Sequence, residues 1–260
     1  MMARRRKKRK TKSNRWIGWV VCLVFLLAAL YYYRPWEYFE EDVFTHDSQW
    51  PYKDETSGRP YSRGYDGIDI SRHQGRIHWE VLSKNRDIQL IYVKATEGRR
   101  HKDSRYAEYI REARKAGFKV GSYHFLRKGS GKEQFEHFRK VVDRGKQDIL
   151  PMVDVEAKGT RGMSRSEIQK ILKEFVTEAK AYYGKSPVIY SNEAYYKKYL
   201  SPEFDNYYLF IANYNRKPVL PGKVKYDLWQ YSEKGRVRGI WTWVDLIRLA
   251  SGRRVRDLEI

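Results

Sequence analysis

From Tyr65 onward, short apolar runs alternate with longer segments in which apolar residues recur at helical spacing. Runs of four to seven residues are typical of strands, and the periodic segments between the earlier runs are typical of amphipathic helices. Strands that alternate with helices predict a parallel sheet. The predicted strands are residues 67–71, 90–95, 119–125, 150–155, 187–191, 208–212, 227–231 and 243–246. The predicted helices are residues 79–85, 104–116, 132–144 and 164–183.

The number and spacing of these runs predict the fold class. Eight short strands in about 190 residues favour a closed barrel, and the last strands lie too close together for full helices between them. We therefore predict an irregular (β/α)-barrel of the α/β class, with an open doubly wound sheet as the competing architecture. Ser164 followed by Glu167 predicts a capping box at the start of the longest helix, and Gly184 suits its C-terminal cap.

The N-terminal part has a different pattern. Residues 4–10 are all Lys or Arg, and residues 16–33 form an uncharged apolar run of 18 residues, near the lower limit for a transmembrane helix. Positive charge before the run predicts a cytoplasmic N-terminus and an extracytoplasmic body held at the cell membrane by one span, with a cleaved signal peptide as the alternative. We divide the chain into a basic tail at 1–15, a transmembrane anchor at 16–33, a linker at 34–63 and a barrel domain at 64–260.

Composition narrows the partners without choosing one. The net charge of +21 stays strongly positive when the basic tail is set aside, which favours anionic partners such as nucleic acid, anionic lipid or acidic cell-wall polymer. Nucleic-acid binding would depend on charge alone, so we do not predict it, and no obligate protein partner is implied. The single cysteine, Cys22, excludes intrachain disulfides and a cysteine metal cluster. No nucleotide-binding loop, metalloprotease motif or serine-hydrolase elbow occurs, and we predict neither a metal nor a cofactor.

The strongest chemical candidates are acidic residues at the ends of predicted strands, where the functional side chains of parallel barrels lie. Asp154 and Glu156 are two residues apart, so they project to one face of a strand with Cα atoms about 6.5–7 Å apart. Two carboxyl groups this close cannot both ionise freely, so one becomes a general acid near neutral pH. Glycosidases need such a pair, although a metal site or a solvated strand end could also account for it.

Other polar residues close predicted strands in the same way. Asp69 lies between two isoleucines, so it faces either the solvent or the barrel interior, where it could instead bond loop amides. Lys94 and Glu97 close the second run and could pair with each other, and a hydrogen-bonded structural role is favoured for His124. Trp229 suits stacking on a sugar ring, with core packing as the alternative.

Seven short motifs occur along this part of the chain, from about Tyr65 to about Leu249. They read G-I-D-I-S-x-x-Q-G, K-A-T-E-G, G-x-Y-H-F, D-V-E, I-Y-S-N, L-W-Q-Y and a late V-D. Each motif is modest alone, but together, in this order and spacing, they are highly specific. In this order the segments resemble glycoside hydrolase family 25, the Chalaropsis-type lysozymes.

The resemblance implies an irregular (β/α)-barrel that cleaves the β-1,4 bond between N-acetylmuramic acid and N-acetylglucosamine in peptidoglycan glycan strands. It implies that Glu156 is the general acid/base and that Asp154 and Asp69 are further catalytic acids. We favour substrate assistance, in which Asp154 orients the 2-acetamido group of the sugar, over a carboxylate nucleophile. The side chains that the resemblance places along the sugar groove are Asp245, Glu97, Tyr123, Tyr190, Trp229 and Gln230.

One stretch departs from the family pattern. Residues 240–243 read Ile-Trp-Thr-Trp where family members often have small or polar residues, which predicts a reshaped far end of the groove. Two other functions stay open: a non-catalytic module that tethers membrane to wall, and an N-acetylglucosaminidase or chitinase-like hydrolase on the same barrel. The intact Asp69, Asp154 and Glu156 argue against the tether, because a pure binding module does not need a carboxylate pair.

Overall fold

The computed structural model describes residues 22–25 and 56–260. Residues 22–25 are helical, and they are described here by themselves. The predicted basic tail and most of the predicted membrane anchor and linker lie outside the described residues. Within the described residues, no helix combines the length and the apolar character that a membrane crossing requires.

The strands from residue 67 onward close into a barrel. The sheet order is β1-β9-β8-β7-β6-β5-β4-β2-β3, and pairing of β1 with β2 closes the ring of eight strands, leaving β3 as a short extension on the end of β2. This confirms the predicted barrel and excludes an open doubly wound sheet. The strands are β1 Gly67–Ile70, β2 Leu90–Glu97, β3 His101–Lys102, β4 Lys119–Phe125, β5 Met152–Asp154, β6 Val188–Asn192, β7 Tyr208–Ala212, β8 Leu228–Gly235 and β9 Val244–Leu249.

The direction of β9 differs from the prediction of a parallel sheet. β9 pairs antiparallel with both β1 and β8, whereas β1, β2, β4, β5, β6, β7 and β8 pair in parallel. The connection from β8 to β9 is too short for the crossover that a parallel strand requires, so the chain reverses as a hairpin. In consequence the first residues of β9 lie at the same end of the barrel as the last residues of the other strands.

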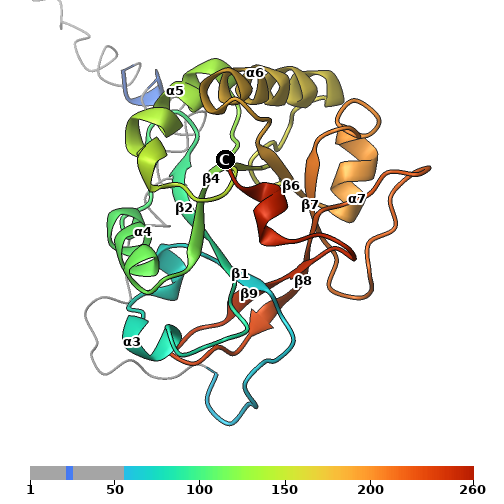
Figure 1. Ribbon diagram of the computed structural model, residues 1–260. Coiled ribbons are helices and arrows are strands. Elements are labelled where there is room, and N and C mark those ends of the chain that lie inside the picture. Colours follow the sequence, from blue (N-terminus) through green and yellow to red (C-terminus); the bar gives the residue numbers. More distant parts are fainter. Residues whose placement is uncertain (1–21, 26–55) are drawn as a thin grey trace, which may run out of the picture. The chain divides into compact units, whose positions relative to one another are not determined.

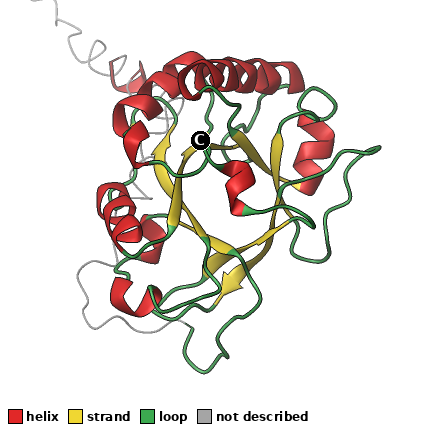
Figure 2. Cartoon of the chain, viewed as in Figure 1, coloured by secondary structure: helices red, strands yellow, loops and turns green. Residues whose placement is uncertain are grey.

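Helices cover the barrel unevenly, as the spacing of the strands predicts. Figure 1 shows α3 to α6 beside the early strands and α7 beside β6 and β7, and Figure 2 shows that the connection from β8 to β9 carries no helix. The helices are α3 Trp79–Leu82, α4 Tyr106–Lys115, α5 Gly131–Val141, α6 Arg165–Tyr183 and α7 Glu193–Tyr195, with 3₁₀ turns η2 Arg72–Gln74, η3 Arg144–Lys146 and η5 Val255–Leu258 and the π-helical turn η4 Tyr196–Leu200.

The longest helix begins and ends where the sequence predicts. At its start the Ser164 hydroxyl accepts from the Glu167 N–H, and the Glu167 carboxylate accepts from the Ser164 N–H at 2.7 Å, which completes the capping box. At its end Gly184 has φ of 81°, the left-handed conformation that glycine adopts without a steric penalty.

Alternation along the strands separates two apolar layers. One set of side chains packs outward against the helices, and Ile68 and Ile70 belong to it. The other set fills the barrel interior, where Tyr92 packs near Phe210 with ring centroids 6.3 Å apart. Because Asp69 lies between the two isoleucines, it projects inward, which decides between the two orientations that the sequence left open.

The C-terminal segment closes one end of the barrel. The η5 turn, red beside the C-terminus in Figure 1, lies across the opening at which the strands begin. The Leu150 N–H donates to the Leu258 carbonyl at 2.7 Å, and Ile149 bridges Glu259. Leu258 is fully buried among the interior side chains. Only the opposite end of the barrel, where the parallel strands finish, therefore remains open for a functional site.

Residues 56–63, which the sequence analysis assigns to the linker, contact the β8–β9 hairpin. The Arg236 guanidinium donates from Nε to the Thr56 hydroxyl at 2.8 Å, and the Ser62 N–H donates to the Arg236 carbonyl at 2.9 Å. The same guanidinium stacks 4.2 Å from the centroid of the Tyr61 ring. Within the described residues, the contacts of the barrel thus include Thr56, ahead of the first strand.

Candidate active site

Four acidic side chains gather at the open end of the barrel. Asp69 lies near the end of β1, Asp154 ends β5, and Glu156 follows it by two residues. Asp245 lies at the start of β9, and because β9 is antiparallel it pairs directly with Asp69. The structure therefore brings together the three predicted catalytic acids and the late acidic residue, from three separate strands and one loop.

Asp154 and Glu156 influence each other's protonation. Burial raises the pKa of Asp154 well above its usual value, and the negative charge of Glu156 raises it further. Burial also raises the pKa of Glu156, while the Tyr190 hydroxyl and the Lys94 charge partly offset the effect. Among the described residues, the buried Oδ1 atom of Asp154 has no hydrogen-bond partner. The pair can therefore hold a proton near neutral pH and accept a hydrogen bond from a ligand.

Asp69 and Asp245 form a second carboxyl pair. Burial raises the pKa of Asp69 to about 6, although hydrogen bonds from Gln230 and Asp245 lower it. Burial, the charge of Asp69 and the hydrogen bond that they share raise the pKa of Asp245 to about 9. At neutral pH Asp245 therefore carries the shared proton, and Asp69 carries the negative charge.

A short chain of hydrogen bonds positions Asp69 from the other side. The Gln230 amide donates to Asp69 Oδ2 at 2.9 Å, and its carbonyl oxygen accepts from Tyr190 at 2.7 Å and from Tyr214 at 2.8 Å. The two tyrosine hydroxyl groups donate to the same amide oxygen, which fixes the orientation of the Gln230 side chain. The sequence analysis named Gln230 and Tyr190 but not Tyr214, which lies in a loop with no strand or helix pattern.

Glu97 is part of a buried ion cluster. The Lys94 ammonium donates to Glu97 Oε2 at 2.6 Å, and Arg127 Nε donates to Glu97 Oε1 at 2.6 Å. Burial alone would raise the pKa of Glu97, but the two cations outweigh it and hold the pKa at about 2. Pairing of Lys94 with Glu97, one of the two predicted roles, is thus present. The Lys94 charge also lowers the pKa of Asp154, so this cluster faces the acid pair.

The remaining predicted residues have distinct surroundings. Tyr123 is buried in the barrel interior, where burial and the charges of Asp69 and Asp154 raise its pKa. Trp229 is half-buried, and its indole N–H donates to the Asn213 carbonyl at 2.8 Å. His124 is fully buried between Thr96 and Gln134, so its predicted structural role is confirmed. Residues 56–260 contain no group of three or more potential ligands that could hold a metal ion.

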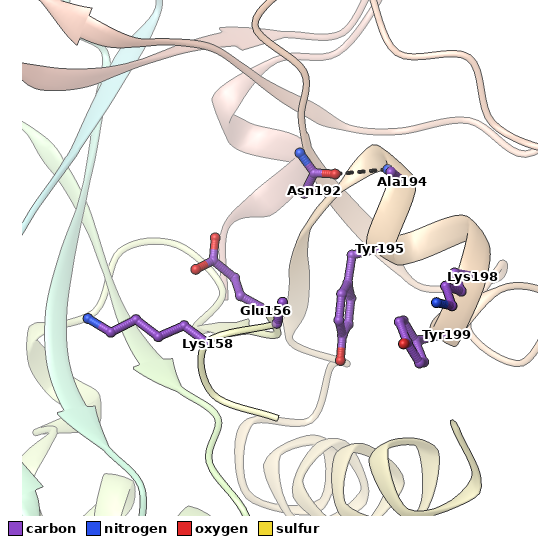
Figure 3. Close-up of a pocket in the computed structure, with 8 residues that line it drawn as sticks. Glu156, Lys158, Asn192, Ala194, Tyr195, Lys198 and Tyr199 are labelled. Atoms are coloured by element: carbon purple, nitrogen blue, oxygen red, sulfur yellow. Dashed lines mark hydrogen bonds between the residues drawn. The ribbon is translucent and has the colours of Figure 1, made fainter. Parts of the chain in front are cut away.

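A hollow of about 430 Å³ opens beside Glu156, and the sequence analysis did not anticipate it. Figure 3 shows Tyr195 standing between Glu156 and the neighbouring Tyr199 and Lys198. We call this surface the Tyr195 hollow. Its lining residues are Glu156, Ala157, Lys158, Asn192, Ala194, Tyr195, Lys198 and Tyr199.

The loop after β7 is held by a second ion cluster that the sequence did not indicate. Glu193 accepts hydrogen bonds from Lys197 at 2.6 Å, from Asn213 at 2.5 Å and from Arg216 at 3.0 Å. Lys197 lies in the η4 turn, and Asn213 and Arg216 lie in the β7–β8 loop, so the cluster fixes that loop to α7 and η4. This loop carries Tyr214 and the carbonyl that binds Trp229, which places both at the mouth of the barrel.

Such a barrel, with paired carboxyl groups at the ends of its strands, is typical of an acid–base glycoside hydrolase. The model of the family described as glycosyl hydrolases family 25 matches residues 68–240, which is more than half of the chain. The chain belongs to glycosyl hydrolases family 25, and the resemblance seen in the motifs is confirmed.

Individual relatives agree with this assignment. The chain is 33% identical over 187 residues to the uncharacterized protein YegX of Escherichia coli K12, covering 70% of this chain and 68% of that protein. It is 30% identical over 210 residues to Lysozyme M1 of Streptomyces globisporus, covering 73% of this chain and 69% of that protein. The solved family 25 glycosyl hydrolase of Bacillus anthracis matches with a TM-score of 0.68 at 27% identity, covering 75% of this chain and 95% of that one.

Replacing Asp245 with asparagine should stabilise the protein increasingly as the pH rises. The pKa of Asp245 is about 9 in the folded protein, whereas an unfolded aspartate titrates near about 3.9. Between these values the folded state binds the extra proton, so wild-type stability falls as the pH rises. Because asparagine does not titrate, the variant should not lose this stability as the pH rises. Thermal unfolding followed by circular dichroism should therefore give Asp245→Asn an advantage in Tm that grows by several degrees between about pH 5 and pH 9.

The matched control is Asp87→Asn, because Asp87 is exposed and lies outside the acid cluster. Its difference in Tm from the wild type should be the same at both pH values. A pH-independent difference for Asp245→Asn as well would mean that Asp245 is ionised in the folded protein.

Proposed function

We propose that this chain hydrolyses the β-1,4 bond between N-acetylmuramic acid and N-acetylglucosamine in peptidoglycan. The observation that carries the proposal is the Asp154–Glu156 pair, in which burial raises both pKa values at the open end of the barrel. Relatives named as lysozymes support the same substrate, among them Lysozyme M1. The surplus of positive charge suits a wall polymer that carries carboxylates or phosphates.

The first chemical step assigns one proton transfer to Glu156. Its carboxyl group donates a proton to the oxygen of the leaving sugar while the bond between that oxygen and the anomeric carbon breaks. The 2-acetamido oxygen of the retained sugar forms a new bond to the same carbon and gives a cyclic oxazolinium ion. Asp154 accepts a hydrogen bond from the acetamido N–H through its unpartnered Oδ1 atom, which aligns the attacking oxygen.

The second step restores the enzyme. The Glu156 carboxylate takes a proton from a water molecule, whose oxygen attacks the anomeric carbon and opens the ring of the oxazolinium ion. The configuration at that carbon is retained because it is inverted twice. Asp69 carries negative charge at neutral pH and stabilises the positive charge that develops on the sugar in both steps.

The predicted groove residues surround the four acids, and their positions indicate their roles. Trp229 is half-buried at the mouth, so its indole face can stack on a sugar ring. Gln230, Tyr190 and Asp245 hold Asp69 in place, and Tyr123 forms the floor beneath the acids. Glu97 acts through Lys94, whose charge limits how far the pKa of Asp154 rises.

Cleavage should depend on Glu156. Purified full-length chain should release fragments with N-acetylmuramic acid at the reducing end from isolated peptidoglycan, as identified by mass spectrometry. Glu156→Gln cannot donate the proton and should lower the rate by about 10² to 10⁴-fold. The control Glu80→Gln changes an exposed carboxylate on α3 and should leave the rate unchanged. Reducing-end N-acetylglucosamine would instead make the enzyme a glucosaminidase, and binding without cleavage would make it a tether.

Asp154→Asn tests the assisted mechanism. Asparagine is nearly isosteric and can still accept the N–H, but it lacks the negative charge that polarises the acetamido group, so kcat should fall by about 10²-fold or more while KM changes little. Wild-type enzyme should cleave chemically de-N-acetylated peptidoglycan equally slowly, because that substrate lacks the attacking oxygen. Near-normal turnover of Asp154→Asn on native peptidoglycan would contradict the role given to Asp154.

Residues 16–33 are proposed to anchor the enzyme in the cell membrane with the barrel on the extracytoplasmic side. An anchored hydrolase acts only on wall within reach of the membrane. In cells that express the full chain, the protein should fractionate with membranes, resist high salt and become accessible to protease only from the extracytoplasmic side. Release of a shorter chain into the extracytoplasmic fluid would indicate a cleaved signal peptide instead.

A further inference from the structure

The Tyr195 hollow is a separate surface from the acid cluster. Of the four acids, only Glu156 lines it, and Asp69, Asp154 and Asp245 do not. In Figure 3 the hollow extends from Glu156 toward α7 and the η4 turn. Because Glu156 must reach the oxygen of the reacting bond, the hollow lies next to that bond and can receive a part of the substrate that is not itself cleaved.

The floor of the hollow is aromatic and fixed in position. The rings of Tyr195 and Tyr199 lie 4.5 Å apart between centroids at an interplanar angle of 31°. The Tyr195 hydroxyl is hydrogen-bonded to Thr160, whose own hydroxyl donates to the Glu156 carbonyl at 2.7 Å. The floor is thus tied to the same loop that carries the catalytic acid, so a group bound on it has a defined position relative to Glu156.

Two lysines line the hollow, and Figure 3 shows Lys158 on the far side of Glu156 and Lys198 beside the tyrosine floor. Lys198 is exposed, and its ammonium lies 5.0 Å from the centroid of the Tyr199 ring. Within residues 56–260 it makes no ion pair, unlike Lys197, which is bound to Glu193. Asn192 adds a side-chain amide, whose oxygen accepts from the Ala194 N–H at 2.9 Å. The hollow therefore offers aromatic faces, one side-chain amide and the exposed ammonium of Lys198.

We propose that the Tyr195 hollow binds the carboxylated peptide stem of the glycan chain. Backbone and apolar parts of an acidic peptide match the tyrosine faces, and its carboxylate matches Lys198. A neutral sugar alone would leave the ammonium without a partner. The inference rests on the proposed function, because it names the portion of peptidoglycan that the enzyme holds beside the reacting bond.

A second basic surface shows that lysine content alone does not make such a site. The groove between α5 and α6 contains three lysines, but Lys132 pairs with Glu178 and Lys173 pairs with Glu203, and its lining has no aromatic side chain. Lys170 is exposed, carries the same charge as Lys198 and lines this groove but not the Tyr195 hollow. It is therefore a matched control for the general effect of positive charge.

The test compares two substrates and three variants of the full chain. The substrates are native peptidoglycan sacculi and the same sacculi after carbodiimide and ammonium chloride have converted their free carboxyl groups to amides. The variants are Lys198→Gln, Lys198→Arg and Lys170→Gln, measured beside the wild type by the rate at which new reducing ends appear. On native sacculi Lys198→Gln should lower kcat/KM by about two- to fivefold, the effect of one exposed ion pair.

Three further results are expected if the hollow binds a carboxylate. Lys198→Arg should keep the wild-type rate, Lys170→Gln should behave like the wild type, and amidated sacculi should be cleaved equally by wild type and Lys198→Gln. Equal rates of Lys198→Gln and Lys170→Gln on native sacculi would overturn the inference while leaving the hydrolase intact. An equal loss for Lys198→Gln on amidated sacculi would also overturn it. No cleavage by the wild type would overturn the proposed function and this inference with it.

Discussion

The structure depends on holding several carboxyl groups close together in a buried barrel mouth while keeping the total negative charge there low. A lone ionised carboxylate in such surroundings is strongly disfavoured, so neighbouring groups must share protons or face cations. Asp245 and Asp69 share one proton, while burial raises the pKa values of Asp154 and Glu156, and the Glu156 charge raises that of Asp154 further. The charge of Lys94 limits the rise of both pKa values. Acid catalysis at a glycosidic oxygen requires a carboxyl group with a raised pKa, and this arrangement provides one.

The pairing of strands makes this arrangement possible. In a barrel of parallel strands, the last inward side chain of each strand lies at the same rim. The antiparallel β9 differs, because it brings a residue from its start to this rim. That residue, Asp245, pairs directly with Asp69. Closure of the opposite end by Leu258 removes the alternative opening. The fold therefore concentrates titratable groups at one rim and apolar side chains everywhere below it.

Local features could be predicted from the sequence, and features that join distant elements could not. The eight strands of the barrel and the capping box at Ser164 follow from patterns within a few residues. The sequence predicts one strand face for Asp154 and Glu156, but β5 ends at Asp154 and Glu156 lies in the loop that follows it. The direction of β9 does not follow from such patterns, because alternation of apolar residues is the same for either direction. The cluster around Glu193 and the Tyr195 hollow also escaped prediction. Their members come from α7, a loop and a π-helical turn, in a stretch for which the sequence pattern predicts neither a strand nor a helix.

Binding an uncleaved part of the substrate in the Tyr195 hollow can raise the rate of bond cleavage at Glu156. Contacts with an uncleaved part of the substrate accelerate a reaction only when they are stronger in the transition state or when they orient the reacting bond. The hydrogen bonds from Tyr195 through Thr160 to the Glu156 carbonyl favour such an orientation, because they join the floor of the hollow to the loop of the acid. Glu156 is only partly buried and sits outside its strand, so its loop needs this support more than Asp154 does. A polymer held on both sides of Glu156 presents its glycosidic oxygen to an acid that is already in place.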